Sequence, residues 1–222
     1  MIRLHHVPFS RSFRVLWLLE EMGLPFDIVT YSITDGSLRA PDFMAVSPAA
    51  RVPGLEIDGL SLFESGAIVE YLCETRPEHG FGRALGDPER PRYLQLIHFA
   101  ETMASILEQL NLNHLFLRDP SKASPTVIKI NTRRLASTLA ALEELLPEEG
   151  YLLESGFSGA DAMLGFNLFA APYYMPLDGF PKLRAYRDRL TARPAYQTAR
   201  VKDGAQDFYT RDFYPVPEEP MP

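Results

Sequence analysis

The stretch that decides the fold is residues 48–71, PAARVPGLEIDGLSLFESGAIVEY. Asp58-Gly59 separates two short apolar runs, and an Asp-Gly pair in this position predicts a two-residue β-hairpin turn. Val52 precedes a proline, which predicts an extended backbone with free hydrogen-bonding groups. Ser65 is a typical N-cap for the apolar helix that follows, and the amides of a first helical turn attract anions. The stretch therefore predicts an open backbone edge beside an anion-binding helix end, which suits a small peptide with a free α-amino acid end.

The first part of the chain predicts a βαβ unit. Residues 2–7 and 26–31 are short runs rich in apolar and β-branched side chains, which predict strands. Residues 13–22 lie between them and carry apolar side chains at helical spacing. Two strands joined in this way are parallel, with a right-handed crossover. A short irregular helix over residues 35–46 and the hairpin complete the order βαβ-α-ββα, which predicts an α/β thioredoxin-like domain over residues 1–76.

The second half of the chain predicts only helices. Residues 77–92 are rich in proline and glycine and have no sustained apolar period, so we expect a linker. Residues 93–222 then predict an all-α domain with an aromatic tail, and Ser158 with Asp161 predicts a capping box. The tail, residues 203–222, is expected to be loose or draped over the domain. The expected helices cover 93–117, 125–147, 162–171 and 183–190, and one more begins at Pro194.

The composition limits the classes of function. Of the 222 residues, 46% are hydrophobic and 23% are charged, which is typical of a globular protein with one or two domains. A formal charge of -7 argues against nucleic acid or a membrane surface as the main partner. The single cysteine, Cys73, excludes an internal disulfide framework. No apolar run approaches the roughly 20 residues of a membrane span, and no signal-peptide core begins the chain, so we expect a cytoplasmic protein.

Four motifs together resemble those of the cytosolic glutathione S-transferases. In chain order they are Ser10-Arg11-Ser12 with the helix that follows, Ser47 to Pro53, Glu64-Ser65-Gly66-Ala67-Ile68, and Ser158 to Asp161. The first is similar to the Ser-Arg-Ser opening of a bacterial and fungal branch, and its serine register resembles that of theta-like, serine-type members. The second resembles the family's segment that ends in Val-Pro with a cis peptide bond. Because the motifs keep the family's order and spacing over nearly the whole chain, the chain is identified as a member of this superfamily.

The resemblance implies a glutathione site beside the hairpin. The backbone of Val52, before a cis Pro53, would pair with the cysteinyl part of glutathione. Ser65 would bind the γ-glutamyl carboxylate through its hydroxyl and amide, and Glu64 would bind the ammonium group. Arg51 is a candidate for the glycine carboxylate, and a solvent-exposed arginine is the alternative. For Ser65 alone, the alternative is a plain helix cap.

The resemblance also implies chemistry on the glutathione thiol, whose free pKa is about 8.5. A hydrogen-bond donor beside a helix N-terminus stabilises the thiolate, and no proton-abstracting residue is required. Ser10 is the favoured donor, and Ser12 is either its rival or the N-cap of the first helix. Arg11 would add a positive field near the sulfur, face solvent or contact a partner subunit. Cys73 is expected to be a buried core thiol, so mixed-disulfide chemistry at this site is disfavoured.

The second substrate would be an apolar electrophile in a pocket next to the thiol. Phe9 is expected to form one apolar wall of that pocket. The further candidates, for which core packing is the alternative, are Phe99, Met103, His114, Tyr173, Tyr174 and the aromatic tail. The sequence does not identify the electrophile, because such a pocket is built from variable apolar side chains without a motif.

Two classes of function stay open from the sequence. The favoured one is a glutathione transferase that acts in detoxification, with glutathione as co-substrate and a homodimer implied by the resemblance. The other is a binding or interaction protein that keeps the fold without turnover. Among enzymes, a glutathione-dependent peroxidase, lyase, dehalogenase or isomerase is the alternative.

Other cofactors are not expected. The chain has no P-loop and no dinucleotide glycine fingerprint, which argues against a nucleotide. His5 and His6 are neighbours on a strand and therefore point to opposite faces, so they cannot bind a metal together. His98 and Glu101 share a helix face without a third ligand, and we expect a solvated pair.

Overall fold

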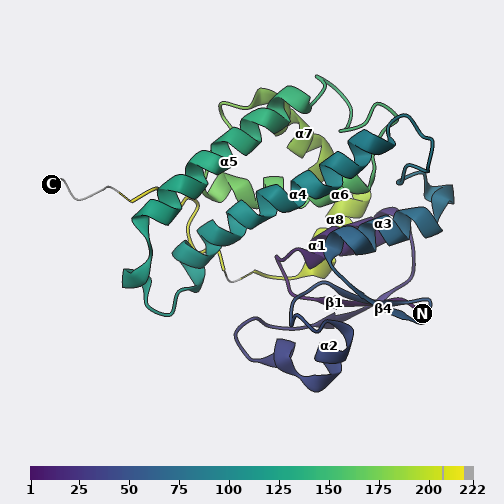
Figure 1. Ribbon diagram of the computed structural model, residues 1–222, viewed down its shortest axis with the longest axis horizontal. Helices are drawn as coiled ribbons and strands as arrows, with labels where there is room; N and C mark the ends of the chain where they lie inside the picture. Colours follow the sequence, from purple (N-terminus) through teal and green to yellow (C-terminus); the bar gives the residue numbers. More distant parts are fainter. Residues whose placement is uncertain (207, 218–222) are drawn as a thin grey trace.

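The structure is a computed structural model, and it describes residues 1–206 and 208–217. A four-stranded sheet with helices on both faces is followed by a group of helices stacked beside it (Figure 1). The first part contains β1 (Arg3–His6), α1 (Ser12–Glu21), β2 (Asp27–Thr30), η1 (Ser37–Arg39), α2 (Pro41–Val46), β3 (Gly54–Ile57), β4 (Leu60–Phe63), α3 (Ser65–Thr75) and η2 (Pro77–His79). This order of elements confirms the predicted thioredoxin-like domain.

The sheet has the strand order β2-β1-β3-β4, with β1 parallel to β2 and antiparallel to β3. The predicted hairpin is present, since β3 pairs antiparallel with β4 and Ile57 lies opposite Leu60. Asp58 and Gly59 have φ angles of 53° and 79°, the left-handed conformations that a type I′ turn requires. Helices α1 and α3 cover the face of the sheet toward the helical part, and α2 lies on the other side (Figure 1).

The second part is all helical, as predicted. It contains α4 (Arg90–Asn111), a π-helical turn η3 (Leu112–Phe116), η4 (Pro120–Lys122), α5 (Pro125–Leu145), α6 (Gly159–Ala170), η5 (Ala171–Tyr173), α7 (Pro181–Thr191) and α8 (Pro194–Asp203). Helix α4 begins three residues before its predicted start. Pro91 is compatible with the first turn, because the backbone N–H that proline lacks has no hydrogen-bond partner at that position of a helix. The Ser158 N–H donates to the Asp161 carboxylate at 2.7 Å, one half of the predicted capping box.

The C-terminal tail is draped over the helical part. Tyr214 is buried, and its backbone N–H donates to the carbonyl of Tyr173 at 2.8 Å. The Tyr209 hydroxyl donates to Asn111 of α4 at 2.9 Å. The predicted tail extends to residue 222, and its residues 207 and 218–222 lie outside the described part. Within the described ranges, no helix is both long enough and apolar enough to cross a membrane.

Helix α6 is the centre of the core. Its side chains are almost all buried, and it packs against α4 on one side and α1 on the other. The contact with α1 is close because Gly165 of α6 lies against the ring of Trp17. A Cβ atom at residue 165 would lie 2.8 Å from Cζ3 of Trp17 and 2.9 Å from Cδ1 of Leu190.

We expect Gly165→Ala to lower the free energy of unfolding by about 1–3 kcal/mol, because the added methyl group overpacks this contact. Urea unfolding followed by Trp17 fluorescence measures the change. Gly179→Ala is the matched control, since nothing lies within 4 Å of its added Cβ. Equal stability of the two variants would contradict the close-packing argument.

Candidate functional site

The site consists of two adjoining hollows, one lined by the sheet part and the other lined by both the sheet part and the helical part. The first, called here the polar hollow, is lined by Arg11, Ser47, Ala49, Arg51, Val52, Pro53, Phe63, Glu64 and Ser65. The second, called here the apolar cavity, has a volume of about 410 Å³ and is lined mainly by apolar side chains. Arg11 and Arg51 line both, so the two hollows meet at these guanidinium groups.

The polar hollow brings together all five residues predicted to bind glutathione. The Val52-Pro53 peptide bond is cis, as the family resemblance implied. Glu64 is exposed and has a φ of 73°, and it occupies the N-cap position of α3 without a side-chain capping bond. Ser65 is the first residue of the helix rather than its N-cap, so that prediction is wrong. The reason is tertiary, because the Ser65 hydroxyl is hydrogen-bonded to side chains of α1 and α4.

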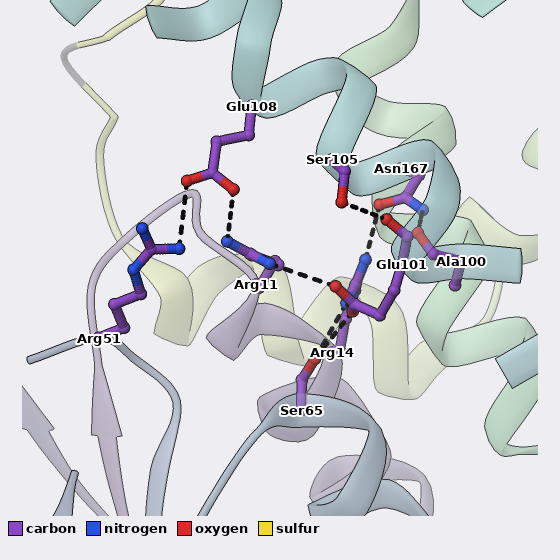
Figure 2. Close-up of polar contacts among 9 residues, drawn as sticks. All are labelled: Arg11, Arg14, Arg51, Ser65, Ala100, Glu101, Ser105, Glu108 and Asn167. Atoms are coloured by element: carbon purple, nitrogen blue, oxygen red, sulfur yellow. Dashed lines mark hydrogen bonds and ion pairs between the residues drawn. The ribbon is translucent and has the colours of Figure 1, made fainter. Parts of the chain in front are cut away.

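Behind Ser65 lies Arg14, a functional residue that the sequence analysis missed. Its side chain is fully buried, and it donates to Ser65 Oγ at 2.9 Å and to Asn167 Oδ1 at 2.8 Å (Figure 2). It also contacts the carboxylate of Glu101. Burial lowers the pKa of Arg14, and the Glu101 carboxylate opposes that shift. The sequence did contain a sign of this role, because Arg14 is the one charged residue in the apolar run of residues 13–19. A charge buried among such residues needs a charged or hydrogen-bonding partner.

Two glutamates of α4 face the arginines of the sheet part. Arg11 donates to Glu101 at 3.2 Å and to Glu108 at 3.0 Å, and Arg51 donates to Glu108 at 3.3 Å (Figure 2). Together with Arg14, three guanidinium groups thus meet these two carboxylates, and the exposed Glu64 carboxylate lines the same polar hollow, so groups of both charges are placed around it. Such a set suits a ligand that carries both carboxylate and ammonium groups.

Two sequence predictions change here. Glu101 turns inward to Arg11 and Arg14, so the expected solvated pair with His98 is wrong. Burial alone would raise the pKa of the Glu101 carboxyl, but the Arg14 and Arg11 guanidiniums lower it below its ordinary value. Arg51 is exposed and ion-paired with Glu108, and its role toward the glycine carboxylate stays a prediction.

The two serines of the first turn have different surroundings. Ser10 lines the apolar cavity, and its hydroxyl donates to the carbonyl of Val7 at 2.8 Å. Ser12 is fully buried, and its Oγ lies 2.7 Å from Nδ1 of His6. Arg11, rather than Ser12, occupies the N-cap position of α1, so the capping alternative for Ser12 is wrong. Only Ser10 of the pair is therefore placed to reach a ligand in the cavity.

Phe9 forms a wall of the apolar cavity, together with residues from α4, α6 and the tail. The other apolar lining residues include Ile33, Leu107, Leu112, Leu115, Phe116, Phe166, Phe208 and Tyr209. The ring of Phe9 lies 4.6 Å from that of Phe169 and 5.5 Å from that of Tyr209. Phe208 and Tyr209 of the aromatic tail thus close one side of the cavity, and the role of the tail toward an electrophile stays a prediction.

Several predicted pocket residues do not line the cavity. Met103 is fully buried in the core, and Phe99 packs against that core. His114 instead stacks on Tyr174, with ring centroids 5.5 Å apart, and burial lowers its pKa. Tyr173 stacks on Tyr209 at 4.0 Å and so supports the lining from behind.

Two other chemistries have little support. Cys73 is buried, and burial raises the pKa of its thiol to about 12, so it is not a nucleophile at neutral pH. Among the residues that the structure describes, no three histidine, cysteine, aspartate or glutamate side chains are grouped to hold a metal ion.

Both parts of the chain match known protein families. The family described as "Glutathione S-transferase, N-terminal domain" matches residues 1–74, and the family described as "Glutathione S-transferase, C-terminal domain" matches residues 125–189. The chain belongs to the glutathione S-transferases. Helix α1 and the cis Val52-Pro53 turn lie in the first matched region, and α5, α6 and most of α7 lie in the second.

Individual relatives agree over nearly the full length. Glutathione S-transferase 3 of Schizosaccharomyces pombe is 27% identical over 100% of this chain and 97% of its own. Glutathione S-transferase 3 of Zea mays is 28% identical over 88% and 91%. Among solved structures, a sphingomonad glutathione S-transferase complexed with glutathione has 26% identity, a TM-score of 0.78 and coverage of 92% and 100%. The bacterial transferase BphK, solved as a ternary complex, has 26% identity, a TM-score of 0.80 and coverage of 91% and 100%.

We expect Glu101→Gln to lower the free energy of unfolding by about 2 kcal/mol at neutral pH, because it leaves the buried Arg14 without a charged partner. The folded-state pKa of Glu101 is depressed, so its contribution is complete above the ordinary glutamate pKa of about 4.3 and is lost as the pH falls through the folded-state value. Urea unfolding at a series of pH values measures this.

The control is Glu144→Gln, which removes an exposed carboxylate of α5. Its effect on stability should be small at every pH. A Glu101→Gln deficit that stays constant down to strongly acidic pH would show that the Arg14 ion pair does not stabilise the fold.

Proposed function

We propose that this protein is a glutathione transferase that stabilises the glutathione thiolate for attack on a hydrophobic electrophile. The observation that carries the proposal is the meeting of the two hollows, where Ser10 faces the apolar cavity and Arg11 and Arg51 line both. A peptide in the polar hollow would thus present its sulfur to a molecule in the apolar cavity. The names of the fungal and plant relatives and the glutathione-bound sphingomonad structure support the same activity.

Each part of glutathione has a chemically suitable partner in the polar hollow. The backbone of Val52 would pair with the cysteinyl residue, and the Glu64 carboxylate would bind the γ-glutamyl ammonium group. The Ser65 hydroxyl donates to Glu101 through a long bond of 3.3 Å, which the γ-glutamyl carboxylate would replace. Arg51 would exchange its 3.3 Å contact with Glu108 for the glycine carboxylate. The guanidinium groups of Arg11 and Arg51, with the carboxylate of Glu64, suit a ligand that carries both carboxylates and an ammonium group.

The reaction needs the thiolate and the electrophile side by side. The hydroxyl of Ser10, at the entrance to α1, would donate to the sulfur and stabilise its negative charge. The thiolate then attacks the electrophilic carbon, a carbon–sulfur bond forms, and any leaving group departs with its electron pair. Holding both reactants in adjoining hollows converts the encounter into a positioned reaction. A scaffold without turnover has no need for this arrangement, so it favours an enzyme.

We expect glutathione bound to the protein to show the ultraviolet absorbance of a thiolate at neutral pH. Ser10→Ala should remove most of that absorbance and lower kcat/KM with an aryl halide about 100-fold, as the loss of a donor to a developing anion does. Ser137→Ala, on the far helix α5, is the control and should leave both unchanged. An intact thiolate in Ser10→Ala, or no affinity for millimolar glutathione, would refute the proposal.

We also propose a cytoplasmic homodimer, the location and assembly that the family resemblance implies. Analytical ultracentrifugation at micromolar concentration should give twice the mass of the chain. A sedimentation profile with monomer alone at that concentration would contradict the dimer.

A further inference from the structure

Behind Ser10, a row of hydrogen-bonding groups leads from the cavity into the interior. Ser10 Oγ lies 2.8 Å from Ser12 Oγ, which lies 2.7 Å from Nδ1 of His6. Nε2 of His6 lies 3.3 Å from the carboxylate oxygen Oδ1 of Asp203. We call these four side chains the serine–histidine row. They come from the end of β1, the turn after it, the start of α1 and the end of α8.

Only one end of the serine–histidine row reaches the cavity. Ser10 lines it, whereas Ser12 is fully buried, His6 is 1% exposed and the Asp203 side chain is 0% exposed. Protein groups therefore, and not bulk water, surround the inner three members. An interaction between a charge and a hydrogen-bonding partner is strong in such surroundings.

The carboxylate of Asp203 is fixed at the inner end of the row. Its Oδ1 accepts the N–H of Phe9 at 3.2 Å, and its Oδ2 accepts from Arg200. Among the described residues, Asp203 is the charged group in contact with His6, and Arg200 lies on the far side of that carboxylate. A histidine with a hydroxyl at Nδ1 and a carboxylate near Nε2 is arranged to accept a proton from the hydroxyl and to have its positive charge balanced.

We propose that His6 accepts the proton of the glutathione thiol through Ser12 and Ser10. This inference rests on the proposed function, because it concerns how the thiolate forms. His6 and Asp203 touch no part of glutathione and act only through the two serines. The distances of 2.8 Å and 2.7 Å along the row are short enough for protons to pass without movement of the backbone.

One proton leaves the thiol and one proton reaches His6. Before this transfer, neutral His6 accepts at Nδ1 from Ser12, the Ser10 hydroxyl turns its hydrogen from the Val7 carbonyl to Ser12, and a lone pair of Ser10 accepts the thiol proton. The sulfur–hydrogen bond breaks with its electron pair left on sulfur, and one proton moves along each hydrogen bond. Afterwards His6 carries a proton on both nitrogens and donates to Ser12, Ser12 donates to Ser10, and Ser10 donates to the thiolate. The products are a thiolate and an imidazolium beside Asp203.

The consequence differs from that of a serine acting alone. If Ser10 only stabilised the thiolate, each thiolate formed would release one proton to the solvent. With the serine–histidine row, the proton stays inside the protein, and the solvent receives almost none.

The test uses the unmodified protein and glutathione near neutral pH. Ultraviolet absorbance measures the thiolate formed, and a pH indicator in weak buffer measures the protons released. We expect a clear thiolate signal with well under one proton released for each thiolate. Nitrogen-15 NMR should show His6 change to its imidazolium form with glutathione and remain neutral with S-methylglutathione, which has no thiol proton.

Variants extend the test. His6→Gln keeps a polar side chain that does not take up a proton, so the thiolate fraction should fall about tenfold and each remaining thiolate should release about one proton. His5→Gln is the matched control: His5 is a buried histidine of the same strand, but it contacts Glu56 and Tyr31 on the other face. Its proton release should equal that of the unmodified protein. If His6→Gln fails to fold, the nitrogen-15 NMR and the proton release of the unmodified protein still decide whether His6 takes up the thiol proton.

The outcomes separate the two proposals. A thiolate that forms with one proton released and with His6 still neutral would overturn the proton transfer and leave the transferase proposal standing. A protein that binds glutathione without forming any thiolate, or that does not bind it, would overturn both.

Discussion

The rest of the site depends on one buried cation, the guanidinium of Arg14. A buried charge is tolerated only where partners surround it, and Arg14 draws them from three helices: Ser65 of α3, Glu101 of α4 and Asn167 of α6. Asn167 in turn donates to the carbonyl of Ala100 at 2.7 Å, which ties α6 to α4 beside Glu101 (Figure 2). The helical part is therefore fixed against the sheet part at the residue that would bind the γ-glutamyl group. Stability and ligand recognition share the same contacts.

The polar hollow and the apolar cavity lie next to each other but are lined by different kinds of side chain. The glutamates of α4 lie on the helix face toward the arginines, and Leu107 of α4 lines the apolar cavity together with Leu112 and Leu115 of η3. Helix α4 and the turn η3 that follows it thus place carboxylates beside the polar hollow and apolar side chains beside the cavity. The tail closes the cavity with Phe208 and Tyr209, of which Tyr209 contacts Asn111 and the stacked ring of Tyr173 and Phe208 contacts the ring of Phe116.

Features with local causes could be predicted from the sequence. The Asp58-Gly59 hairpin depends on two neighbouring residues, and the βαβ order depends on short runs of apolar side chains. Predictions failed where distant side chains decide. Serine is a preferred N-cap residue, but the Ser65 hydroxyl is hydrogen-bonded to Arg14 and Glu101 instead of capping the helix. The partners of Arg14 are separated from it by up to 153 positions in the sequence, a distance at which propensity and periodicity carry no information.

The different partners of His5 and His6 follow from the alternation of side chains along a strand. Alternation along a strand places His5 and His6 on opposite faces, which was an argument against a shared metal site. In the structure, that same alternation sends His5 to Glu56 and Tyr31, and sends His6 under α8 to Asp203 and Ser12. The position of His6 behind Ser10 follows from the strand, but its carboxylate partner comes from the C-terminal end of the last helix, 197 residues away. The thiol side of the site is therefore complete only when α8 packs against α1, so both halves of the chain contribute to it.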